Sequence, residues 1–574
     1  MPFAGGRMKR FIFVLLTFLI IINIFAYEYD QGVKIDGNKV TFRLWAPGKQ
    51  SIAVVGDFND WNISENMLKE VGDGYWETQI KLHKGEFRYQ YVLNGEKFIG
   101  DPYATDVEWD ELGPNGVIEV GKKDFTWNDK NFTPVQHNDT VIYELHLGDF
   151  TPMGTYLAAK DKIPYLKDLG VNAVKILPWM EFPGDISWGY NPTYFFAPET
   201  VYGDPDDLKA FINECHKNGI SVIQDMVFNH TSHDHPFNQI YDYYNSPWYS
   251  TDSNPWGMPD LNHWSDRTKI FIKDVINYWI REYHIDGIRY DYTRGIGWDG
   301  YNGVSYITWC AREAGKDINK YIFQIAEHLP QDPQMVFKTD MDAEWHDSFH
   351  DQMKANLREG TFENSNYYGD LDKTMNSIDF RGSGFGDMAN VINYTESHDE
   401  ERVIYEAMTN PAVDYIKAVR KSRLGASVLF TSAGIPMIYH GQEFGMDTHR
   451  TIDSNKIKWD KLKSWPGDGL YLHYKKLIEL RKNHMSLRQN NIQEVAKYSD
   501  KKVLIYKRWD NYGDVIIVVA NFSDQDQYIN IPFPYNGKWH EAIYNYSVDV
   551  YNGIISNHQI GKSDVKIFCL KKTW

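Results

Sequence analysis

One segment of the chain places an arginine two residues before an aspartate, Asp286-Gly-Ile-Arg-Tyr-Asp291. If residues 288–291 are extended, side chains two apart share a face, so Arg289 and Asp291 point the same way and Tyr290 points the other way. A guanidinium beside a carboxylate keeps the acid ionised and fixes its orientation, which a nucleophilic aspartate requires. Taken alone, an Arg-x-Asp pair is more often a buried structural ion pair.

Three further segments place polar side chains after short apolar runs. They are residues 225–230, which include Asp225 and His230, residues 324–327, which end at Glu327, and residues 396–399, which end at His398-Asp399. If the runs are parallel strands of a barrel, their carboxyl ends all meet at one mouth. Four such segments at one mouth would be a rare structural coincidence, so together they indicate a catalytic site.

The elements that must position these side chains alternate between strand-like and helix-like patterns. Expected helices cover 157–169, 205–218 and 269–283. Alternating strands and helices predict a parallel sheet, and we expect an α/β fold, a (β/α)8 TIM barrel over 138–485 with a short insertion at 231–264. The expected strands are 141–147, 173–177, 221–227, 287–291, 321–327, 341–345, 389–394 and 434–440.

Both flanks of the barrel show antiparallel β patterns. Residues 27–125 contain alternating strands and a hairpin signal at Asn94-Gly95, which predicts an N-terminal β-sandwich. After Arg481 the strand–helix alternation stops, and residues 490–574 are expected to form a C-terminal β-sandwich with antiparallel strands.

The N-terminus and the composition bear on location and partners. Met8-Lys-Arg10 precedes an apolar run at 11–22 and then Ala26, so residues 1–26 are predicted to be a signal peptide of an exported (secreted or periplasmic) protein. An uncleaved signal anchor stays open as an alternative. The net charge of −18 argues against nucleic acid or an anionic membrane as a partner. Three widely spaced cysteines form neither a disulfide framework nor a metal motif.

The polar segments resemble the four sequence regions of the α-amylase superfamily, glycoside hydrolase family 13. D-x-V-x-N-H is found at 225–230, G-x-R-x-D at 287–291, the acid at Glu327 and H-D at 398–399. Met258-Pro-Asp-Leu-Asn262 resembles a further region of some hydrolytic subfamilies. The N-terminal part resembles carbohydrate-binding module family 48 through FRLWAP, GDFNDW and GEFRYQYVLNG; where glycogen-binding members have a Trp and a Lys, this chain has Trp61 and Gln90.

This resemblance implies retaining catalysis on α-glucosidic bonds, with an α-glucan polysaccharide or oligosaccharide as substrate and no cofactor required for the chemistry. Asp291 would be the nucleophile and Glu327 the general acid and base, while Asp399 would hold sugar hydroxyls at the cleavage subsite. The residues that would bind or position the substrate are Tyr190, Asp225, His230, Arg289 and His398.

A structural Ca²⁺ is left open by the resemblance. Many family members hold the ion through an asparagine that corresponds to Asn229, and Asp260 could assist by its position. The short 231–264 loop and Gly295, which stands where calcium-dependent amylases have a histidine, count against the ion.

The reaction type rests on finer resemblances. Residues 143–148, 188–190 and 194–198 are similar to both branching enzymes and maltooligosyl-trehalose trehalohydrolases. Residues 397–400 are also similar to branching enzymes, and 343–349 to the trehalohydrolases. The predicted signal peptide and the Met258–Asn262 segment favour an exported α-amylase-type hydrolase that cleaves α-1,4 bonds of starch or maltodextrins. Branching, trehalohydrolase or debranching activity is the alternative. A non-catalytic glycan-binding protein is a remote one, because the acid and the nucleophile are both present.

Overall fold

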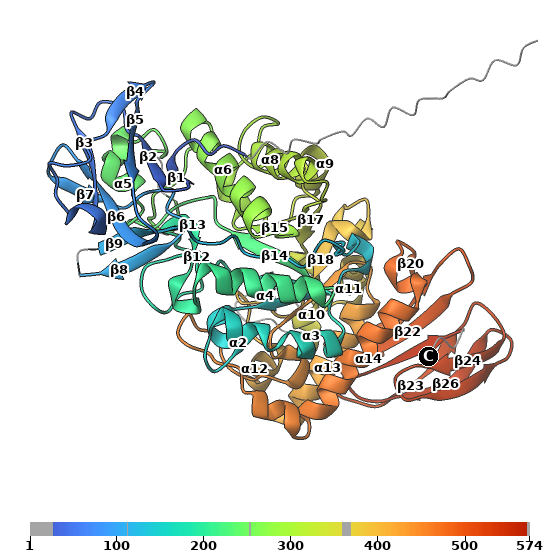
Figure 1. Cartoon of the computed structure of the whole chain (residues 1–574). Helices are drawn as coiled ribbons and strands as arrows, with labels where there is room; N and C mark the ends of the chain where they lie inside the picture. Colours follow the sequence, from blue (N-terminus) through green and yellow to red (C-terminus); the bar gives the residue numbers. More distant parts are fainter. Residues whose placement is uncertain (1–26, 112, 252–253, 359–368, 571–574) are drawn as a thin grey trace, which may run out of the picture.

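The computed structural model describes residues 27–111, 113–251, 254–358 and 369–570. A β-domain at the N-terminal end and another at the C-terminal end lie on opposite sides of a central barrel (Figure 1). The predicted signal peptide at 1–26 falls outside the described residues. Within those residues, no helix is long and apolar enough to cross a membrane.

Eight parallel strands close the central barrel, which confirms the expected fold. Every residue of these strands is buried, because a parallel sheet covered by helices has no solvent face. The sixth strand lies inside the expected 341–345 segment. In order around the barrel the strands are β10 (Ile142–Leu145), β11 (Ala173–Ile176), β14 (Ser221–Met226), β15 (Gly287–Tyr290), β16 (Phe323–Ala326), β17 (Ala343–Trp345), β18 (Val391–Asn393) and β19 (Ile435–Tyr439).

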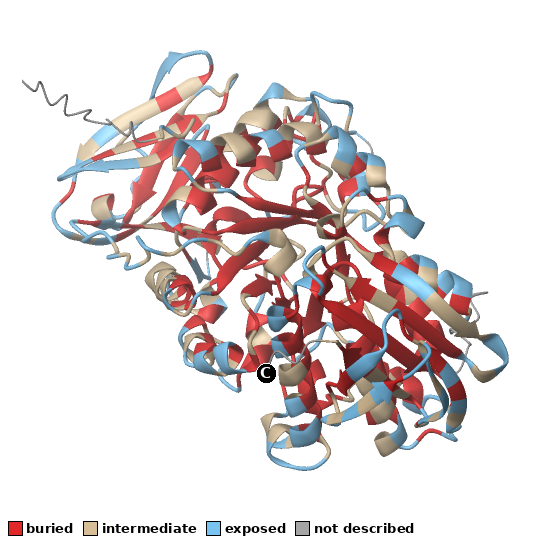
Figure 2. Cartoon of the chain, turned by 90° about the vertical axis from the view of Figure 1, so that its right-hand side faces the viewer, coloured by how far each residue is buried: buried red, intermediate tan, exposed pale blue. Residues whose placement is uncertain are grey.

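Helices pack around the barrel strands, and the interior of the molecule is buried almost throughout (Figure 2). The longer ones are α4 (Pro205–Lys217), α6 (Asp266–Glu282), α8 (Val304–Asp317), α10 (Asp347–Leu357), α13 (Tyr415–Thr431) and α14 (Gly467–Asn483). The shorter ones are α1 (Leu147–Phe150), α5 (Phe237–Ile240), α7 (Thr293–Ile296), α9 (Pro333–Lys338), α11 (Leu371–Ile378) and α12 (Val403–Met408).

The single helix expected over 157–169 is wrong. The structure has two short helices instead, α2 (Tyr156–Lys160) and α3 (Ile163–Leu169). Pro164 explains the break, because proline fits the first turn of a new helix but lacks the N–H that continues an existing one. A two-stranded sheet of β12 (Met180–Glu181) and β13 (Tyr194–Pro198), which the sequence did not indicate, follows β11.

The N-terminal domain is a sandwich of two sheets. One has the order β1-β2-β5-β4 and the other β3-β6-β9-β8, with β7 beside β6. Their bounds are β1 (Gly32–Asp36), β2 (Lys39–Trp45), β3 (Ile52–Gly56), β4 (Lys69–Gly72), β5 (Tyr75–Lys81), β6 (Gly85–Leu93), β7 (Lys97–Ile99), β8 (Val107–Asp110) and β9 (Gly113–Val120). The sandwich is attached to α6 of the barrel, because Asp274 accepts hydrogen bonds from the hydroxyls of Tyr27 at 2.6 Å and Tyr103 at 3.0 Å.

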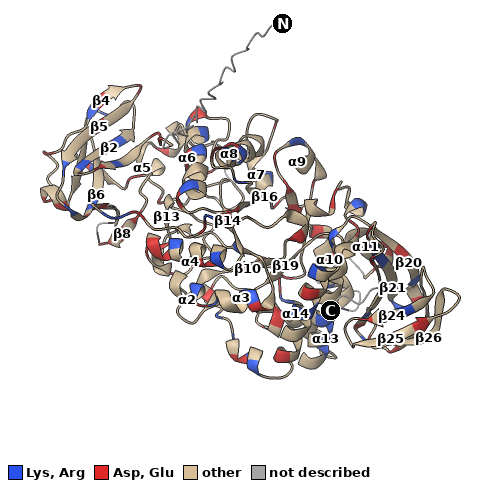
Figure 3. Cartoon of the chain, turned by 45° about the vertical axis from the view of Figure 1, so that its right-hand side comes forward, with Lys and Arg blue, Asp and Glu red and all other residues tan. Residues whose placement is uncertain are grey.

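The C-terminal domain is antiparallel, as expected. A six-stranded sheet, β20-β21-β22-β27-β24-β25, packs with a two-stranded sheet of β23 and β26. The bounds are β20 (Ile492–Tyr498), β21 (Val503–Trp509), β22 (Val515–Asn521), β23 (Gln527–Pro532), β24 (Gly537–Glu541), β25 (Tyr546–Val550), β26 (Ile554–Ile560) and β27 (Asp564–Cys569). The three cysteines are free and buried. In the view of Figure 3, acidic and basic residues are interspersed over the barrel helices.

Candidate active site

A cavity of about 290 Å³ opens at the carboxyl ends of the barrel strands. Six of the eight predicted catalytic and substrate-binding residues line it: Tyr190, His230, Asp291, Glu327, His398 and Asp399. The other two, Asp225 and Arg289, are fully buried directly beneath them. The strand ends therefore bring together side chains that are far apart in the sequence, as a barrel mouth requires.

The guanidinium of Arg289 joins three carboxylates at the bottom of this cavity. Its Nη1 atom lies 3.0 Å from Oδ1 of Asp291 and 2.8 Å from Oδ1 of Asp225. Its Nη2 atom lies 2.9 Å from Oε2 of Glu327. The contact with Asp291 confirms that these two side chains share one face of the strand. One arginine thus holds the two acids that could perform glycosidic chemistry on the same fork.

The protonation of Asp291 differs from the simple expectation that Arg289 keeps it ionised. Burial and the neighbouring Glu327 carboxylate raise the pKa of Asp291 well above its usual range, and the lowering effect of Arg289 does not cancel them. A carboxylate this close disfavours a second negative charge on Asp291. Asp291 is therefore harder to ionise than an ordinary aspartate.

A buried charge network lies below the cavity. Lys175 Nζ lies 3.0 Å from Glu144 Oε1 and 2.5 Å from Asp225 Oδ2, and the Tyr190 hydroxyl donates to the same Asp225 oxygen at 2.7 Å. Sequence reasoning missed the roles of Glu144 and Lys175. The available signal was a charged residue inside each of the otherwise apolar first and second strands, where an unpaired charge would be strongly destabilising.

The two histidines of the cavity differ in charge. Burial opposes protonation of His398, but the carboxylates of Asp399 and Glu144 raise its pKa to about 9. Burial lowers the pKa of His230, whose Nε2 atom lies 2.8 Å from the Tyr190 carbonyl oxygen. At neutral pH the cavity therefore has one imidazolium and one neutral imidazole. The Tyr190 ring stacks on His398 with centroids 5.1 Å apart.

The backbone after β15 holds Glu327. The N–H of Tyr292 donates to Oε2 of Glu327 at 2.8 Å, and the N–H of Thr293 donates to the Glu327 carbonyl at 2.9 Å. Tyr292 has a φ of 41°, in the left-handed region that side chains other than glycine rarely adopt. This strained turn aims its N–H at the carboxylate, which is where strain at a functional site is expected.

The rim of the cavity contains Met258, from the segment noted in the sequence, and two apolar residues that sequence reasoning did not identify, Trp256 and Leu329. Trp256 is 54% exposed, and its ring lies edge-on to the Tyr292 ring with centroids 4.8 Å apart. Oδ1 of Asn254 accepts hydrogen bonds from the N–H groups of Trp256 and Met258, which fixes this loop. Trp256 lies two residues before Met258, the start of the Met258–Asn262 segment, and that proximity was the only sequence signal for it.

The predicted calcium ligands lie next to the cavity rather than in its lining. A backbone bridge pairs His230 with Asp260, so Asn229 and Asp260 are on adjacent segments. Two side chains supply too few oxygens for the six to eight that Ca²⁺ takes. The described residues contain no group of three or more His, Cys, Asp or Glu that could hold a metal. Backbone carbonyls and waters would have to supply the remaining oxygens, and the Ca²⁺ stays a prediction.

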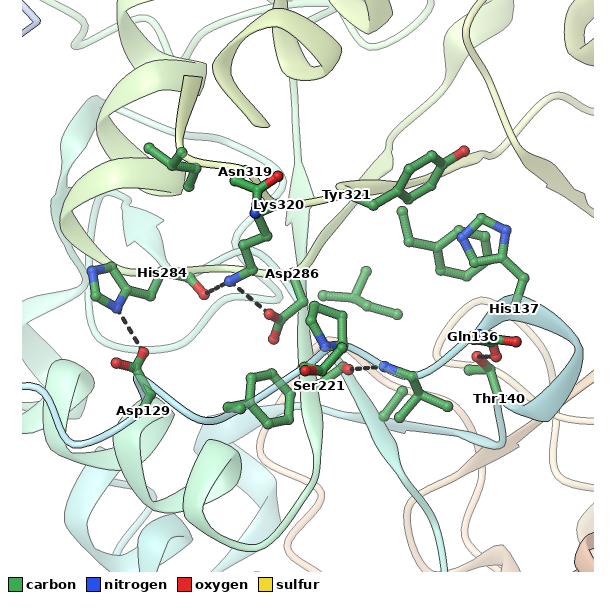
Figure 4. A pocket seen from close by; sticks show the side chains of 18 of the residues that line it. Asp129, Gln136, His137, Thr140, Ser221, His284, Asp286, Asn319, Lys320 and Tyr321 are labelled. Atoms are coloured by element: carbon green, nitrogen blue, oxygen red, sulfur yellow. Dashed lines mark hydrogen bonds and ion pairs between the residues drawn. The ribbon is translucent and has the colours of Figure 1, made fainter. Parts of the chain in front are cut away.

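A larger cavity, of about 1050 Å³, lies at the opposite end of the barrel (Figure 4). Four of its lining residues pair with one another, with Asp129 pointing toward His284 at 2.6 Å and Lys320 toward Asp286 at 2.6 Å. Asp286 and Ser221 stand at the amino ends of their strands, where barrel residues serve stability rather than catalysis. The smaller cavity is therefore the candidate active site.

A barrel with paired acids at its carboxyl end defines a glycoside hydrolase-type enzyme, and comparison with known families agrees. The family model "Alpha amylase, catalytic domain" matches residues 136–256 and 236–468. Carbohydrate-binding module 48 (the isoamylase N-terminal domain) matches 28–104, and the alpha amylase C-terminal all-beta domain matches 495–568. The chain belongs to the α-amylase family of glycoside hydrolases.

Individual relatives have several different activities. A malto-oligosyltrehalose trehalohydrolase of Saccharolobus solfataricus is 31% identical over 443 residues, which span 72% of this chain and 75% of that protein. A 1,4-alpha-glucan branching enzyme GlgB of Fusobacterium nucleatum is 33% identical over 313 residues, which span 51% of this chain and 49% of that protein. The crystal structure of pullulanase type I from Bacillus subtilis has a TM-score of 0.79 at 21% identity, covering 96% and 86% of the two chains, and so shows the shared fold.

The N-terminal module lacks one of the expected sugar contacts. Gln90, which stands in place of the family's lysine, is buried, and its Nε2 atom donates to the Pro114 carbonyl at 3.0 Å. Trp61 is half-buried against Ala53, Val55 and Val92. The side chain of Gln90 is therefore committed to the fold of the module.

Proposed function

We propose that the protein is an exported α-glucan hydrolase of the α-amylase type, which cleaves α-1,4-glucosidic bonds of starch or maltodextrins with retention of configuration. The observation that carries this proposal is the contact of one guanidinium, that of Arg289, with both Asp291 and Glu327. Retaining enzymes need their two carboxyl groups close together, whereas inverting enzymes leave room for a water between the general base and the sugar.

In the first step, Asp291 attacks the anomeric carbon while Glu327 gives its proton to the glycosidic oxygen. The carbon–oxygen bond breaks, the shortened glucan leaves as an alcohol, and a glycosyl ester forms on Asp291. In the second step, Glu327 takes a proton from water as the water oxygen attacks the same carbon. The ester breaks and Asp291 is again a carboxylate. These roles require Asp291 to be ionised and Glu327 to carry the proton when the bond breaks.

The remaining residues of the cavity would bind the reacting sugar. The Asp399 side chain is 38% exposed and accepts hydrogen bonds, so it suits sugar hydroxyls, with the His398 imidazolium beside it. The Tyr190 ring offers an apolar face for stacking. Trp256 and Tyr292, which stand at the rim, suit the next sugar along the chain. The cavity therefore combines polar groups at its base with apolar walls, as sugar sites do.

The alternative that the relatives support is cleavage of malto-oligosyltrehalose or transfer of a glucan segment. Its basis is the trehalohydrolase with 31% identity and the branching enzyme with 33% identity. Water as acceptor gives hydrolysis, and a sugar hydroxyl at the same position gives transfer, so the same acid pair serves both. The predicted signal peptide at 1–26 favours hydrolysis of a glucan outside the cell over the extension of a glucan inside it.

Product analysis of purified protein on amylose, maltooligosaccharides, pullulan and malto-oligosyltrehalose tests the proposal. We expect new reducing ends from amylose and maltooligosaccharides, with the α-anomer formed first by NMR. Free trehalose from malto-oligosyltrehalose as the main product would favour the alternative, and unchanged reducing power with more branch points would establish transfer. Asp291→Asn should abolish each activity while binding remains. Export is tested by locating the protein and its first residue in fractions of producing cells.

A further inference from the structure

A second groove, of about 550 Å³, lies on the flank of the barrel between α8 and α9. Four aromatic residues line it, Tyr301, Tyr306, Trp309 and Phe337, and together they are called the aromatic groove here. Ser305, Lys338, Thr339 and Asp340 supply polar groups along the same walls. None of these residues lines the catalytic cavity.

Three of the four rings are exposed. Tyr301 is 83% exposed, Phe337 51% and Trp309 44%. Single exposed apolar residues are common on protein surfaces, but several around one concave site mark a surface that binds something. Rings exposed in this way are stabilised when a ligand covers them.

The loop that presents Tyr301 is fixed without a ligand. Oδ1 of Asp299 accepts hydrogen bonds from the N–H groups of Tyr301 at 2.9 Å and Asn302 at 2.8 Å. Oδ2 of the same aspartate accepts from Nε1 of Trp264 at 3.1 Å. Backbone that is already held in place loses little conformational freedom on binding, so Tyr301 is preorganised.

The opposite wall is also fixed. Tyr306 and Trp309 are three residues apart on α8, so they share a helix face, and their ring centroids are 5.8 Å apart. Arg312 donates to the Asp340 carbonyl at 2.9 Å, and the Asp340 N–H donates to Oγ1 of Thr308 at 3.3 Å. These bonds tie α8 to the segment that follows α9, so the groove keeps its width.

Exposed rings next to hydroxyl, ammonium and carboxylate groups match the two kinds of surface on a sugar. The C–H face of a pyranose ring packs on an aromatic ring, while its hydroxyls need hydrogen-bond partners such as Asp340 and Lys338. The net charge of −18 makes an anionic polymer a poor occupant. A neutral glucan has no such conflict.

The groove is connected to the active site by a short piece of chain. Tyr301 follows Asp291 by ten residues, which span at most about 33–36 Å even when fully extended. Trp264, which supports the Tyr301 loop, follows the Met258–Asn262 segment beside the cavity rim. A glucan chain held in the groove therefore stays close to the catalytic cavity.

We propose that the aromatic groove is a second α-glucan-binding site, which holds a segment of polymeric substrate outside the catalytic cavity. This inference rests on the proposed α-glucan function. Its effect is to raise the local concentration of polymer at the cavity, as linked binding sites do. Short oligosaccharides, which cannot occupy both sites at once, gain nothing from it.

The double variant Tyr301→Ala/Trp309→Ala tests this site, with Tyr551→Ala (73% exposed, in the C-terminal domain) as the matched control. We expect roughly a tenfold rise in KM for amylose, since the loss of each stacked ring should weaken binding by about a few-fold. Kinetics on maltotriose should not change. Calorimetry should detect two β-cyclodextrin sites on the Asp291→Asn protein. Adding the double substitution to that protein should remove one of them.

The outcomes separate the two proposals. If the double variant keeps the KM of the parent for amylose and both β-cyclodextrin sites, or if a single site is present from the start, the groove does not bind glucan. If maltotriose and amylose kinetics fall together, the variant has damaged the fold or the active site, which circular dichroism and the thermal midpoint distinguish. If the double variant is damaged in this way, the single variant Phe337→Ser replaces it. The ratio of its kcat/KM for amylose to its kcat/KM for maltotriose then decides. If the wild-type protein cleaves no α-glucan, the proposed function fails and this inference fails with it.

Discussion

Nε2 of His398 lies 3.0 Å from Oδ2 of Asp399. On its other side, Nδ1 of the same ring lies 2.9 Å from Oε1 of Glu144. A histidine between two carboxylates is held in one orientation and in its cationic form. This contact links Asp399, which lines the cavity, to the buried charges below it.

We expect kcat/KM to fall as the pH rises through about 9, the pKa of His398, because loss of the imidazolium proton releases Asp399. His398→Gln should remove this alkaline limb. His230→Gln is the control, because burial lowers the pKa of His230 and its titration lies on the other side of neutrality. A limb that remains near pH 9 in His398→Gln would contradict the assignment.

The same pair has a defined effect on stability. The folded pKa of His398 is above the usual value of about 6.5, so its contribution is complete below that pH and is lost as the pH rises toward about 9. The difference in thermal midpoint between wild type and His398→Gln should therefore shrink from pH 6 to pH 10. A constant difference would mean that His398 acts through packing alone.

Glu327→Gln should reduce kcat for maltooligosaccharides by about 10²–10⁴-fold, because glutamine cannot protonate the leaving oxygen. Glucosides with a phenol as leaving group need little protonation and should show a much smaller loss in the first step. The burst of phenol followed by slow turnover is the readout. Equal losses on both substrate types would remove Glu327 from the role of acid.

Arg289→Lys should lower both activity and stability. A lysine keeps the charge but cannot contact Asp225, Asp291 and Glu327 together. We expect a loss of about 1.5–3 kcal/mol in the free energy of unfolding of the barrel, the value of hydrogen bonds to charged groups. Arg381→Lys, at an arginine with a 54% exposed side chain, is the control and should change little. A fully active Arg289→Lys protein would contradict the positioning role of the guanidinium.

Asp129→Asn should loosen the linker between the N-terminal domain and the barrel. The carboxylate lies 3.1 Å from Nδ1 of His216 and 2.6 Å from Nδ1 of His284 (Figure 4 shows the second contact). Burial alone would raise the pKa of Asp129, but the hydrogen bonds from His216 and His284 lower it below its usual range. The stability it contributes is thus present above about pH 3.9 and lost as the pH falls through the lowered value.

Thermal unfolding from pH 7 to well below pH 3, through the lowered pKa of Asp129, measures this contribution. The gap, which is the difference in thermal midpoint between wild type and Asp129→Asn, should be largest near neutrality and should disappear at the acid end. Asp124→Asn, an exposed residue of the same linker, is the control and should match the wild type throughout. A gap that stays constant to the acid end of this range would show that the carboxylate charge is not what holds the linker.

Local patterns were enough to predict much of the architecture and most of the candidate site. The eight barrel strands lie where apolar runs end in polar residues, since a covered parallel strand must be apolar and its carboxyl end must reach the mouth. The break between α2 and α3 could have been predicted from Pro164, but the apolar periodicity of 157–169 obscured it.

By itself, the sequence determined the chemical types at the strand ends, because Asp291, Glu327, His398 and Asp399 each follow a strand pattern that is visible locally. Only the tertiary structure decided their environment. It put Glu144 and Lys175 under the cavity, placed Trp256 at its rim and brought Glu327 to the fork of Arg289, where burial raises the pKa of Asp291. The physical reason is that the pKa and orientation of a side chain depend on neighbours in space, which strand periodicity does not contain.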